Sequence, residues 1–182
     1  EPTLERALAA LAPSDGPMCI LDPCAGEGVA IAEAAHAIGR EQVQAFAVEY
    51  DAERARHARQ LVNRCIHGDL MDTLISRQSF GLLWLNPPYG QETAKWMERL
   101  AAHGNGVALI FARTETAIFF PWVWERATAW LFLKGRLHFH FVDGRRASAN
   151  SGAPSVLVAY GESNAQALAR SGLPGKLLRN GS

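Results

Sequence analysis

The sequence predicts an α/β fold in which helices cover both faces of a mostly parallel sheet. Short apolar runs alternate with longer segments of helical composition between residues 18 and 111, as strands and helices do in such folds. A length of 182 residues and an apolar content of 48% suit a single buried core. We therefore expect one domain over residues 1–182, with its core at about 17–160.

The first part of the chain is expected to contain five strands and three helices. A glycine-containing turn at 26–28 separates the first apolar run from an alanine-rich segment, and a charged segment follows the second run. Periodicity and composition place the strands at 18–21, 43–48, 65–67, 80–85 and 107–111, and the helices at 29–38, about 51–62 and about 93–102.

The spacing of the elements changes after residue 111. Residues 121–127 have helical composition, 130–133 are extended, and 155–160 form a final apolar strand, which makes seven strands in total. Loop-like composition is confined to 143–154 and to the C-terminal tail, and no internal repeat is present. The close spacing of the last two strands departs from the simple alternation of strand and helix.

The charges are balanced overall but not along the chain. The sequence has 18 basic and 18 acidic residues; residues 1–112 carry 9 basic and 14 acidic groups, whereas 113–182 carry 9 and 4. The net charges of the two parts are therefore −5 and +5. A basic C-terminal third is compatible with contact to nucleic acid, although the asymmetry is modest.

Cysteine usage and hydropathy indicate a cytoplasmic protein. Cys19, Cys24 and Cys65 form no CxxC pair, which is typical of free thiols in a reducing compartment. No apolar run reaches the roughly 18 residues of a membrane span, and nothing resembles a signal peptide. His138 and His140 share a strand face without a third residue at metal-ligand spacing, so we predict no metal site.

The first strand leads into a turn with two glycines and two carboxylates. Ile31 occupies the place of the third glycine in the dinucleotide fingerprint, and Asp22 and Glu27 would repel a pyrophosphate. Carboxylates at this position instead suit a ligand with positive charge. The alternative is a tight turn whose glycines, Gly26 and Gly28, only permit close helix packing.

Acidic residues also follow the next two strands. Glu49 ends the second strand, where a carboxylate can accept hydrogen bonds from both hydroxyls of a ribose; the alternative is a solvated acid that opens the next helix. Asp69 follows the third strand and has the alternative of a turn former or helix N-cap. All these strand ends are expected to meet in one crevice at the carboxyl edge of the sheet.

An Asn-Pro-Pro-Tyr segment, residues 86–89, follows the fourth strand. The side-chain oxygen of Asn86 and the carbonyl of Pro87 can accept hydrogen bonds from one planar amino group, which favours a nitrogen with an available lone pair. The prolines restrict the backbone, so the acceptors are set before a substrate arrives. Tyr89 can stack on the ring that carries the amine. The alternative is a rigid turn without chemistry.

Together the two motifs resemble those of class I amino-methyltransferases that use S-adenosylmethionine. The resemblance implies a Rossmann-like sheet of seven strands whose seventh strand runs antiparallel between the fifth and sixth. It also implies roles for particular residues. The implied cofactor-binding residues are Asp22, Pro23, Ala25, Gly26, Gly28, Glu49, Tyr50, Asp69 and Leu70. The implied catalytic residues are Asn86, Pro87, Pro88 and Tyr89.

The C-terminal third resembles the small phage-type DNA N6-adenine methyltransferases. The likeness lies in residues 113–116, 132–139 and 153–156, and with the two motifs it covers roughly residues 18–160. It implies a DNA substrate whose target base is extruded from the duplex. The expected phosphate contacts are Lys134, Arg136, Arg145 and Arg146, with a solvated basic loop as the alternative.

Several alternatives stay open on sequence. The Asn-Pro-Pro-Tyr motif is shared by enzymes that methylate adenine in DNA, adenine in RNA or glutamine in proteins, and cytosine also offers a comparable amine. A catalytically idle fold that serves as a cofactor-binding or partner subunit is a further alternative. The aromatic residues 119–124 can belong to the core, a base pocket or a dimer contact. No separate target-recognition domain is expected, so specificity would come from loops such as 143–154 or from a partner. A recognition partner or a homodimer stays open.

Overall fold

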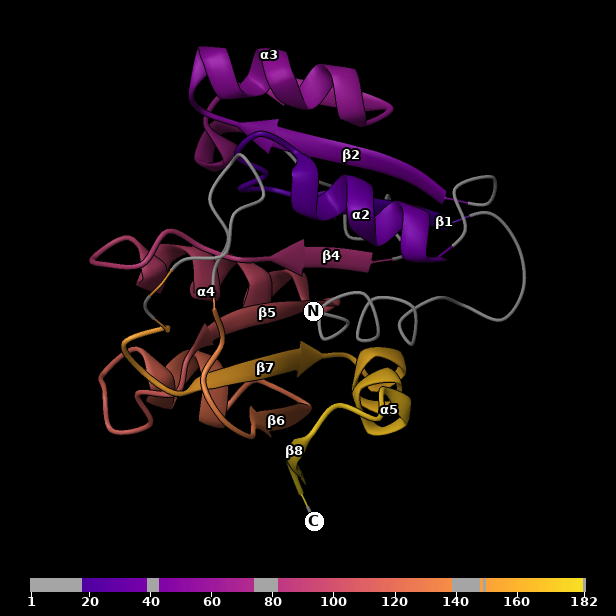
Figure 1. The fold of residues 1–182 in the computed structure, drawn as a ribbon. Coiled ribbons are helices and arrows are strands. Elements are labelled where there is room, and N and C mark those ends of the chain that lie inside the picture. Colours follow the sequence, from indigo (N-terminus) through magenta and orange to yellow (C-terminus); the bar gives the residue numbers. More distant parts are fainter. Residues whose placement is uncertain (1–17, 39–42, 74–81, 139–147, 149, 182) are drawn as a thin grey trace.

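The computed structural model describes residues 18–38, 43–73, 82–138, 148 and 150–181, and these residues form one eight-stranded mixed sheet (Figure 1). The strand order across the sheet is β3-β2-β1-β4-β5-β7-β6-β8. The strands are β1 (Met18–Asp22), β2 (Val43–Glu49), β3 (Arg64–His67), β4 (Leu82–Leu85), β5 (Gly106–Phe111), β6 (Ala129–Leu133), β7 (Ser155–Tyr160) and β8 (Gly175–Arg179).

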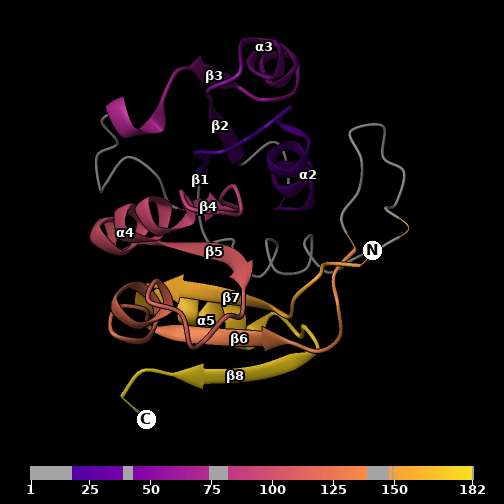
Figure 2. The ribbon, with the colours of Figure 1, turned by 90° about the vertical axis from the view of Figure 1, so that its left-hand side faces the viewer.

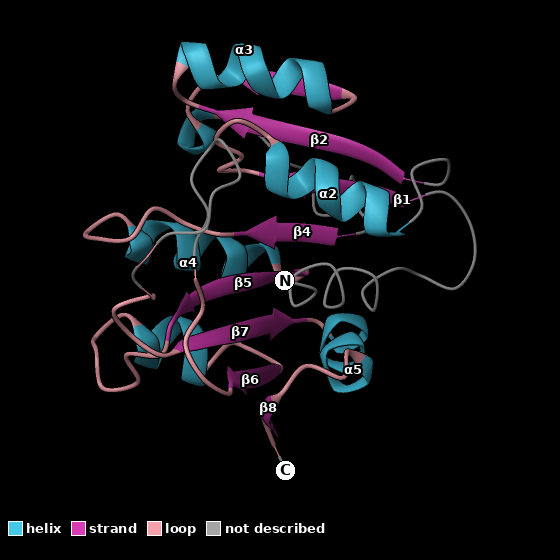
Figure 3. Cartoon of the chain, viewed as in Figure 1, coloured by secondary structure: helices cyan, strands magenta, loops and turns pink. Residues whose placement is uncertain are grey.

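Helices cover both faces of the sheet, as Figure 3 shows by element type. The α-helices are α2 (Val29–Ile38), α3 (Ala52–Leu61), α4 (Thr93–His103) and α5 (Glu162–Arg170), and two short helices are the 3₁₀ helix η1 (Leu70–Asp72) and the π-helix η2 (Phe120–Trp124). Figure 2 shows α2 and α4 on opposite sides of the sheet. The side chains of β4 alternate accordingly: Trp84 packs in the core cluster of α2 and α5, whereas Leu83 and Leu85 pack with α4.

The order of the strands reverses beside β1. From β1 the chain moves outward through β2 to β3 and then returns to β4, so β1 pairs in parallel with β2 on one side and with β4 on the other. In open α/β sheets, ligands bind in the crevice outside the carboxyl ends of the strands at such a switch point. Both sequence motifs follow strands that border this point, because residues 22–28 follow β1 and residues 86–89 follow β4.

The predicted architecture is confirmed, including the direction of the last expected strand. β7 pairs antiparallel with β5 on one side and with β6 on the other. The seven expected strands and the helices 29–38, 51–62 and 93–102 are present with ends that differ by at most two residues. Residues 80 and 81 of the expected fourth strand lie outside the described residues.

One strand more is present than the seven that the sequence predicted. The residues after β7 form α5 and then β8, which pairs antiparallel with β6. The residues of β8, Gly-Lys-Leu-Leu-Arg, are all exposed or half-buried, because β8 lies at the edge of the sheet. A continuous apolar run, the signal by which the other strands were predicted, is therefore missing here.

The aromatic segment 119–124 mostly joins the core. Phe119 and Val123 are buried, and the Trp124 ring makes edge contacts with the rings of Phe119 and Trp130 at centroid distances of 5.1 and 5.0 Å. Phe120 differs, because 54% of it is exposed. Core packing therefore accounts for the segment except for Phe120. The π-helix η2 is also shorter than the helix that was expected at 121–127.

Candidate functional site at the carboxyl edge of the sheet

The loop between β1 and α2 is held by two carboxylates. Asp22 is buried, and its Oδ1 accepts a hydrogen bond from the backbone amide of Cys24 at 2.9 Å. Glu49, at the end of β2, accepts one from the amide of Gly26 at 2.8 Å and another from the amide of Asp51 at 2.9 Å. The two bonds use different oxygens of Glu49, so each oxygen keeps a lone pair for a further donor.

The electrostatics of this pair fit a cationic ligand. Burial raises the pKa of Asp22 to about 7, opposed by the hydrogen bond from Cys24 and assisted by the nearby charge of Glu49. A positive charge next to these groups would favour the ionised form of Asp22. The two carboxylate acceptors therefore suit the sulfonium and ammonium groups of S-adenosylmethionine and not a pyrophosphate. The same surroundings raise the pKa of the Cys24 thiol, which stays protonated.

The two glycines of this loop have different surroundings. A Cβ at Gly28 would lie 2.9 Å from the Cβ of Ala58 on α3, and Gly28 has a φ of +82°. Gly28 thus permits the close approach of the loop to α3, which is the packing role considered as the alternative. Gly26 has a φ of +55°, but a Cβ there would meet nothing within 4 Å. Space for a ligand therefore borders Gly26 and not Gly28.

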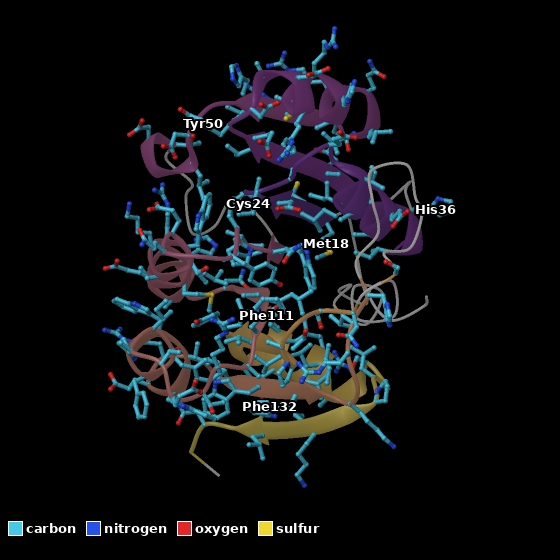
Figure 4. The ribbon with its side chains drawn as sticks, turned by 60° about the vertical axis from the view of Figure 1, so that its left-hand side comes forward. Met18, Cys24, His36, Tyr50, Phe111 and Phe132 are labelled. Carbon is cyan, nitrogen blue, oxygen red and sulfur yellow. The ribbon has the colours of Figure 1, made fainter. Side chains whose placement is uncertain are left out.

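Two other expected cofactor residues, Tyr50 and Asp69, follow the strands β2 and β3. Tyr50 follows β2 with its side chain 76% exposed, and its carbonyl oxygen lies 3.0 Å from His67 Nε2 at the end of β3. Asp69 is exposed, and its carbonyl accepts hydrogen bonds at the 3₁₀ helix η1, including one from Thr73 Oγ1 at 2.7 Å. Figure 4, which brings this edge forward, shows Tyr50 and Cys24 one below the other along the edge.

A cavity of about 190 Å³ lies between α4 and the sheet. Pro23 and Leu70, two of the expected cofactor residues, line the same cavity although they follow different strands. The sequence did not indicate the contribution of α4, because its residues have no motif and lie at ordinary helical spacing. The remaining lining residues are Leu83, Leu85, Trp96, Arg99, Leu100, Ala102 and His103.

The Asn-Pro-Pro-Tyr loop is tied to the start of α4. Thr93, the first residue of α4, donates from its hydroxyl to the carbonyl of Pro88 at 2.9 Å and accepts from the amide of Gly90 at 3.1 Å. Asn86 is half-buried and Pro87 is buried, whereas Pro88 is exposed. The rigid turn expected from the two prolines is thus reinforced by Thr93. Sequence reasoning missed this residue because a threonine at a helix start is common.

Among the described residues of the site, Asn86 and Phe111 contact the Tyr89 side chain. Its hydroxyl donates to Asn86 Oδ1 at 3.3 Å, and its ring stacks on Phe111 with a centroid distance of 4.1 Å and an interplanar angle of 13°. Burial raises the pKa of Tyr89 to about 12, so the hydroxyl stays neutral and donates. Phe111 ends β5 and was not among the predicted site residues. Only the pairing of β4 with β5 brings the two rings together.

Two of the four expected phosphate-binding residues can be placed. Lys134 and Arg136 are exposed and follow β6. Since β5 and β6 both run antiparallel to β7, β6 ends at the same edge as β4 and β5. Lys134 therefore follows a strand that ends at the edge where Asn86 lies. Arg145, Arg146 and His140 lie outside the described residues.

The fold is that of a class I methyltransferase. Similar solved structures include a TehB-like SAM-dependent methyltransferase from Corynebacterium glutamicum (17% identity, TM-score 0.55, covering 88% of this chain and 87% of the other). A second similar structure is a precorrin-6y C5,15-methyltransferase from Geobacter metallireducens (10% identity, TM-score 0.56, covering 87% of this chain and 87% of the other). A third is the 23S rRNA methyltransferase ErmE (16% identity, TM-score 0.57, covering 89% of this chain and 69% of the other). At these identities the likeness shows the fold.

The amino-acid sequence shows the family to which this protein belongs. The family model described as "Uncharacterised methyltransferase family (DUF6094)" matches residues 5–100, which is more than half of the chain. The protein belongs to this methyltransferase family. Its fold is shared with SAM-dependent methyltransferases, which supports S-adenosylmethionine as the cofactor. No curated protein matches the sequence. Among the described residues, none of the helices has the length and apolar character needed to span a membrane.

Proposed function

We propose that this enzyme methylates the exocyclic amino group of adenine in DNA. The observation that carries the proposal is the position of Asn86 to Tyr89 directly after β4, beside the strand β1 that leads into the carboxylate-bearing loop. A rigid pair of acceptors next to a site for a cationic cofactor is the arrangement that amine methylation needs. Catalysis would rest on orientation and electrostatics, without a covalent enzyme intermediate.

The cofactor residues act as follows in this proposal. S-adenosylmethionine supplies an electrophilic methyl group when it is bound. Asp22 stabilises its positive charge, and the lone pairs left on the Glu49 carboxylate accept from the ribose hydroxyls. Asp69 accepts from the adenine amino group, while Pro23 and Leu70 cover the adenine ring in the cavity next to α4. Ala25, Gly26 and Tyr50 border the same crevice.

The residues proposed to bind the substrate orient its amino group. Asn86 Oδ1 and the Pro87 carbonyl would accept hydrogen bonds from the two N–H groups of the amine, so that the nitrogen lone pair could attack the methyl carbon as the bond from that carbon to the sulfonium breaks. One proton of the methylated amine would then leave to water. The ring of Tyr89 provides the stacking face for a base extruded from the duplex. Lys134 and Arg136, together with Arg145 and Arg146, would contact phosphates. The net charge of +5 in residues 113–182 supports a polyanionic substrate.

The proposal is tested by transfer of label from S-adenosylmethionine. The wild-type protein is incubated separately with unmethylated duplex DNA, single-stranded DNA, RNA and cell-extract protein, and the labelled product is digested to nucleosides or amino acids. Label in N6-methyladenine of DNA supports the proposal. Label in 4-methylcytosine, in RNA or in glutamine refutes the substrate but keeps the chemistry, and bound cofactor without any label indicates an idle fold or a missing partner. Asn86→Ala is the matched control.

A further inference from the structure

We propose that Arg113 binds a backbone phosphate of the DNA substrate, and that the DNA lies across the part of the carboxyl edge formed by β5, β7 and β6. The inference rests on the proposed function, because it takes the polyanionic substrate to be DNA. Arg113 was not among the expected phosphate contacts. The inference therefore adds a binding residue and limits the nucleic-acid surface to one half of the edge.

The strand order separates acidic from basic residues along the carboxyl edge. On one side of β4, Asp22 ends β1, Glu49 ends β2 and Asp69 follows β3. On the other side, Arg113 follows β5 and Lys134 follows β6. Figure 2 looks onto this edge, with β3, β2 and β1 above β4 and with β5, β7 and β6 below it. A polyanion is repelled by the acidic half and attracted by the basic half.

The register of the sheet places Arg113 and Lys134 at nearly the same level. Ile110 of β5 and Phe132 of β6 both pair with Val156 of β7, so Arg113 is three residues and Lys134 two residues beyond a common level. Since β7 lies between β5 and β6, the two strands are about 10 Å apart. This is the axial length of roughly three nucleotides of one DNA strand, so both cations can contact phosphates of the same strand.

Aromatic rings connect Arg113 to the loop that contains Asn86. The guanidinium carbon of Arg113 is 5.8 Å from the centroid of the Phe111 ring, which is 4.1 Å from the centroid of the Tyr89 ring. The guanidinium therefore lies no further from Tyr89 than the sum of these distances, and the Tyr89 hydroxyl donates to Asn86 Oδ1. The phosphates nearest the methylated base are those of its own nucleotide and its neighbours. Arg113 is placed to contact one of them.

The positive charges of Arg113 and Lys134 are available to a ligand, because both side chains are exposed. Ion pairs among the described residues neutralise other cations, such as Lys95, which pairs with Glu92, but none of them includes Arg113 or Lys134. Glu115 follows in the same loop as Arg113, yet these two described residues form no ion pair. The cation–π contact orients the guanidinium without removing its charge.

The first test measures how the affinity for DNA depends on salt. A labelled mixed-sequence duplex of about 20 base pairs is titrated by fluorescence anisotropy at about 50–200 mM salt. Each phosphate contact adds about 0.9 to the slope of log affinity against log salt. Arg113→Gln should lower the slope by this amount and weaken binding about 5- to 10-fold at about 0.1 M salt. Lys134→Gln should act in the same way, and Arg113→Lys, which keeps the charge, should retain most of the slope.

Arg64 provides the matched control. It is an exposed arginine at the start of β3, so it lies at the amino edge and at the opposite end of the sheet from β6. Arg64→Gln removes the same charge as Arg113→Gln but should leave the affinity and the slope unchanged. An equal loss in Arg64→Gln would overturn the inference, since net charge and not position would then set the affinity. Circular dichroism and thermal melting verify that the variants are folded.

A second measurement tests the chemistry of the polyanion. Polyglutamate competes with the labelled duplex at equal concentrations of negative charge. The duplex should stay bound, because its dense phosphates release condensed counterions when cations replace them. Displacement of the duplex by polyglutamate would show a surface for an acidic peptide and would overturn the assignment to DNA.

The outcomes separate the inference from the proposed function. In steady-state transfer, Arg113→Gln should raise the KM for DNA about 5- to 10-fold and change kcat little, as for a contact made equally in the ground and transition states. DNA binding that depends on Arg113, without methylated product, supports the surface and refutes DNA methylation. Methylated adenine with an unchanged KM and salt slope in Arg113→Gln overturns the surface and leaves the proposed function intact.

Two further results would also overturn the inference. A fall in affinity for S-adenosylmethionine in Arg113→Gln, measured by calorimetry, would assign Arg113 a structural role in the site and not a contact to phosphate. A wild-type protein that does not bind the duplex at low salt would refute the surface together with the proposed DNA substrate.

Discussion

The carboxylates of Asp22 and Glu49 hold successive parts of one loop, since Asp22 accepts the amide of Cys24 and Glu49 accepts the amide of Gly26. Asp22 ends β1 and Glu49 ends the neighbouring strand β2. The pair stabilises the loop by hydrogen bonds, yet it concentrates negative charge in a place where Asp22 is only 3% exposed. Burial of the Asp22 carboxyl, assisted by the nearby charge of Glu49 and opposed by the hydrogen bond from Cys24, raises the pKa of Asp22 to about 7.

Cofactor binding should depend on pH through Asp22. The pKa of Asp22 is about 7 in the free protein, and a bound cation would lower it, so binding should release a proton when the pH is below 7. We expect affinity for S-adenosylmethionine to be about tenfold higher at pH 8 than at pH 6. Calorimetry in buffers of different ionisation enthalpy measures both the affinity and the number of protons released on binding. Asp22→Asn should abolish most of the dependence, and an unchanged profile would show that Asp22 does not respond to the ligand.

The stability of the cofactor-free protein should also reflect Asp22. Its pKa in the folded protein, about 7, is above the ordinary aspartate value of 3.8, so folding favours its protonated form. The corresponding stability is present in full below 3.8 and is lost as the pH rises to 7. Above pH 7 the free energy of unfolding is lower than its value below pH 3.8 by up to about 4 kcal/mol. Asp22→Asn keeps the acceptor for Cys24 and should unfold at a higher temperature than wild type at pH 8, but not at pH 4. Equal melting curves at pH 8 would contradict this.

Gly28 and Gly26 should respond differently to alanine. Gly28→Ala adds backbone strain at positive φ to a clash with Ala58, for a loss of about 2–5 kcal/mol in the free energy of unfolding. Gly26→Ala adds the strain alone and should cost about 1–2 kcal/mol. Denaturant unfolding measures both. Ala58→Gly should partly restore Gly28→Ala, and a lack of rescue would argue against the packing contact as the cause.

Asn86→Ala should abolish most methyl transfer while cofactor affinity is retained. The substitution removes one acceptor of the substrate amine, and the loss of a single catalytic hydrogen-bond partner typically lowers kcat about 10²- to 10³-fold. Single-turnover transfer and calorimetry with S-adenosylmethionine measure the two effects. If affinity falls in step with activity, Asn86 supports the cofactor site and does not act on the amine.

Thr93→Val should have a milder effect on the same step. It keeps the shape of the side chain but removes the hydroxyl that bonds to Pro88 and Gly90. The Asn-Pro-Pro-Tyr loop would then keep its two prolines but lose its connection to α4. We expect kcat to fall about 3- to 10-fold, as for the loss of one or two ordinary hydrogen bonds. Wild-type kcat in Thr93→Val would indicate that the prolines alone hold the loop.

Local patterns in the sequence determined most of the elements and the positions of the motifs. The α2 boundaries, Val29 and Ile38, and the polar residues at the strand ends were predictable because alanine-rich composition and turn residues act over a few neighbours. β8 was not predictable, since an edge strand needs no continuous apolar run. The contact of Phe111 with Tyr89 was not predictable either, and the sequence left the packing role of Gly28 as one of two alternatives, because each contact joins residues that are distant in sequence.

The sequence by itself thus determined the class of fold, the cofactor motif and the segment expected to bind the amine. Only the tertiary structure decided which side chains meet at the carboxyl edge. Phe111 stacks on Tyr89 because β5 lies next to β4, and Pro23 shares a cavity with Leu70 and Trp96 because α4 covers that face of the sheet. The physical reason is that strand order and helix placement are set by packing between distant segments, whereas each motif is written in consecutive residues.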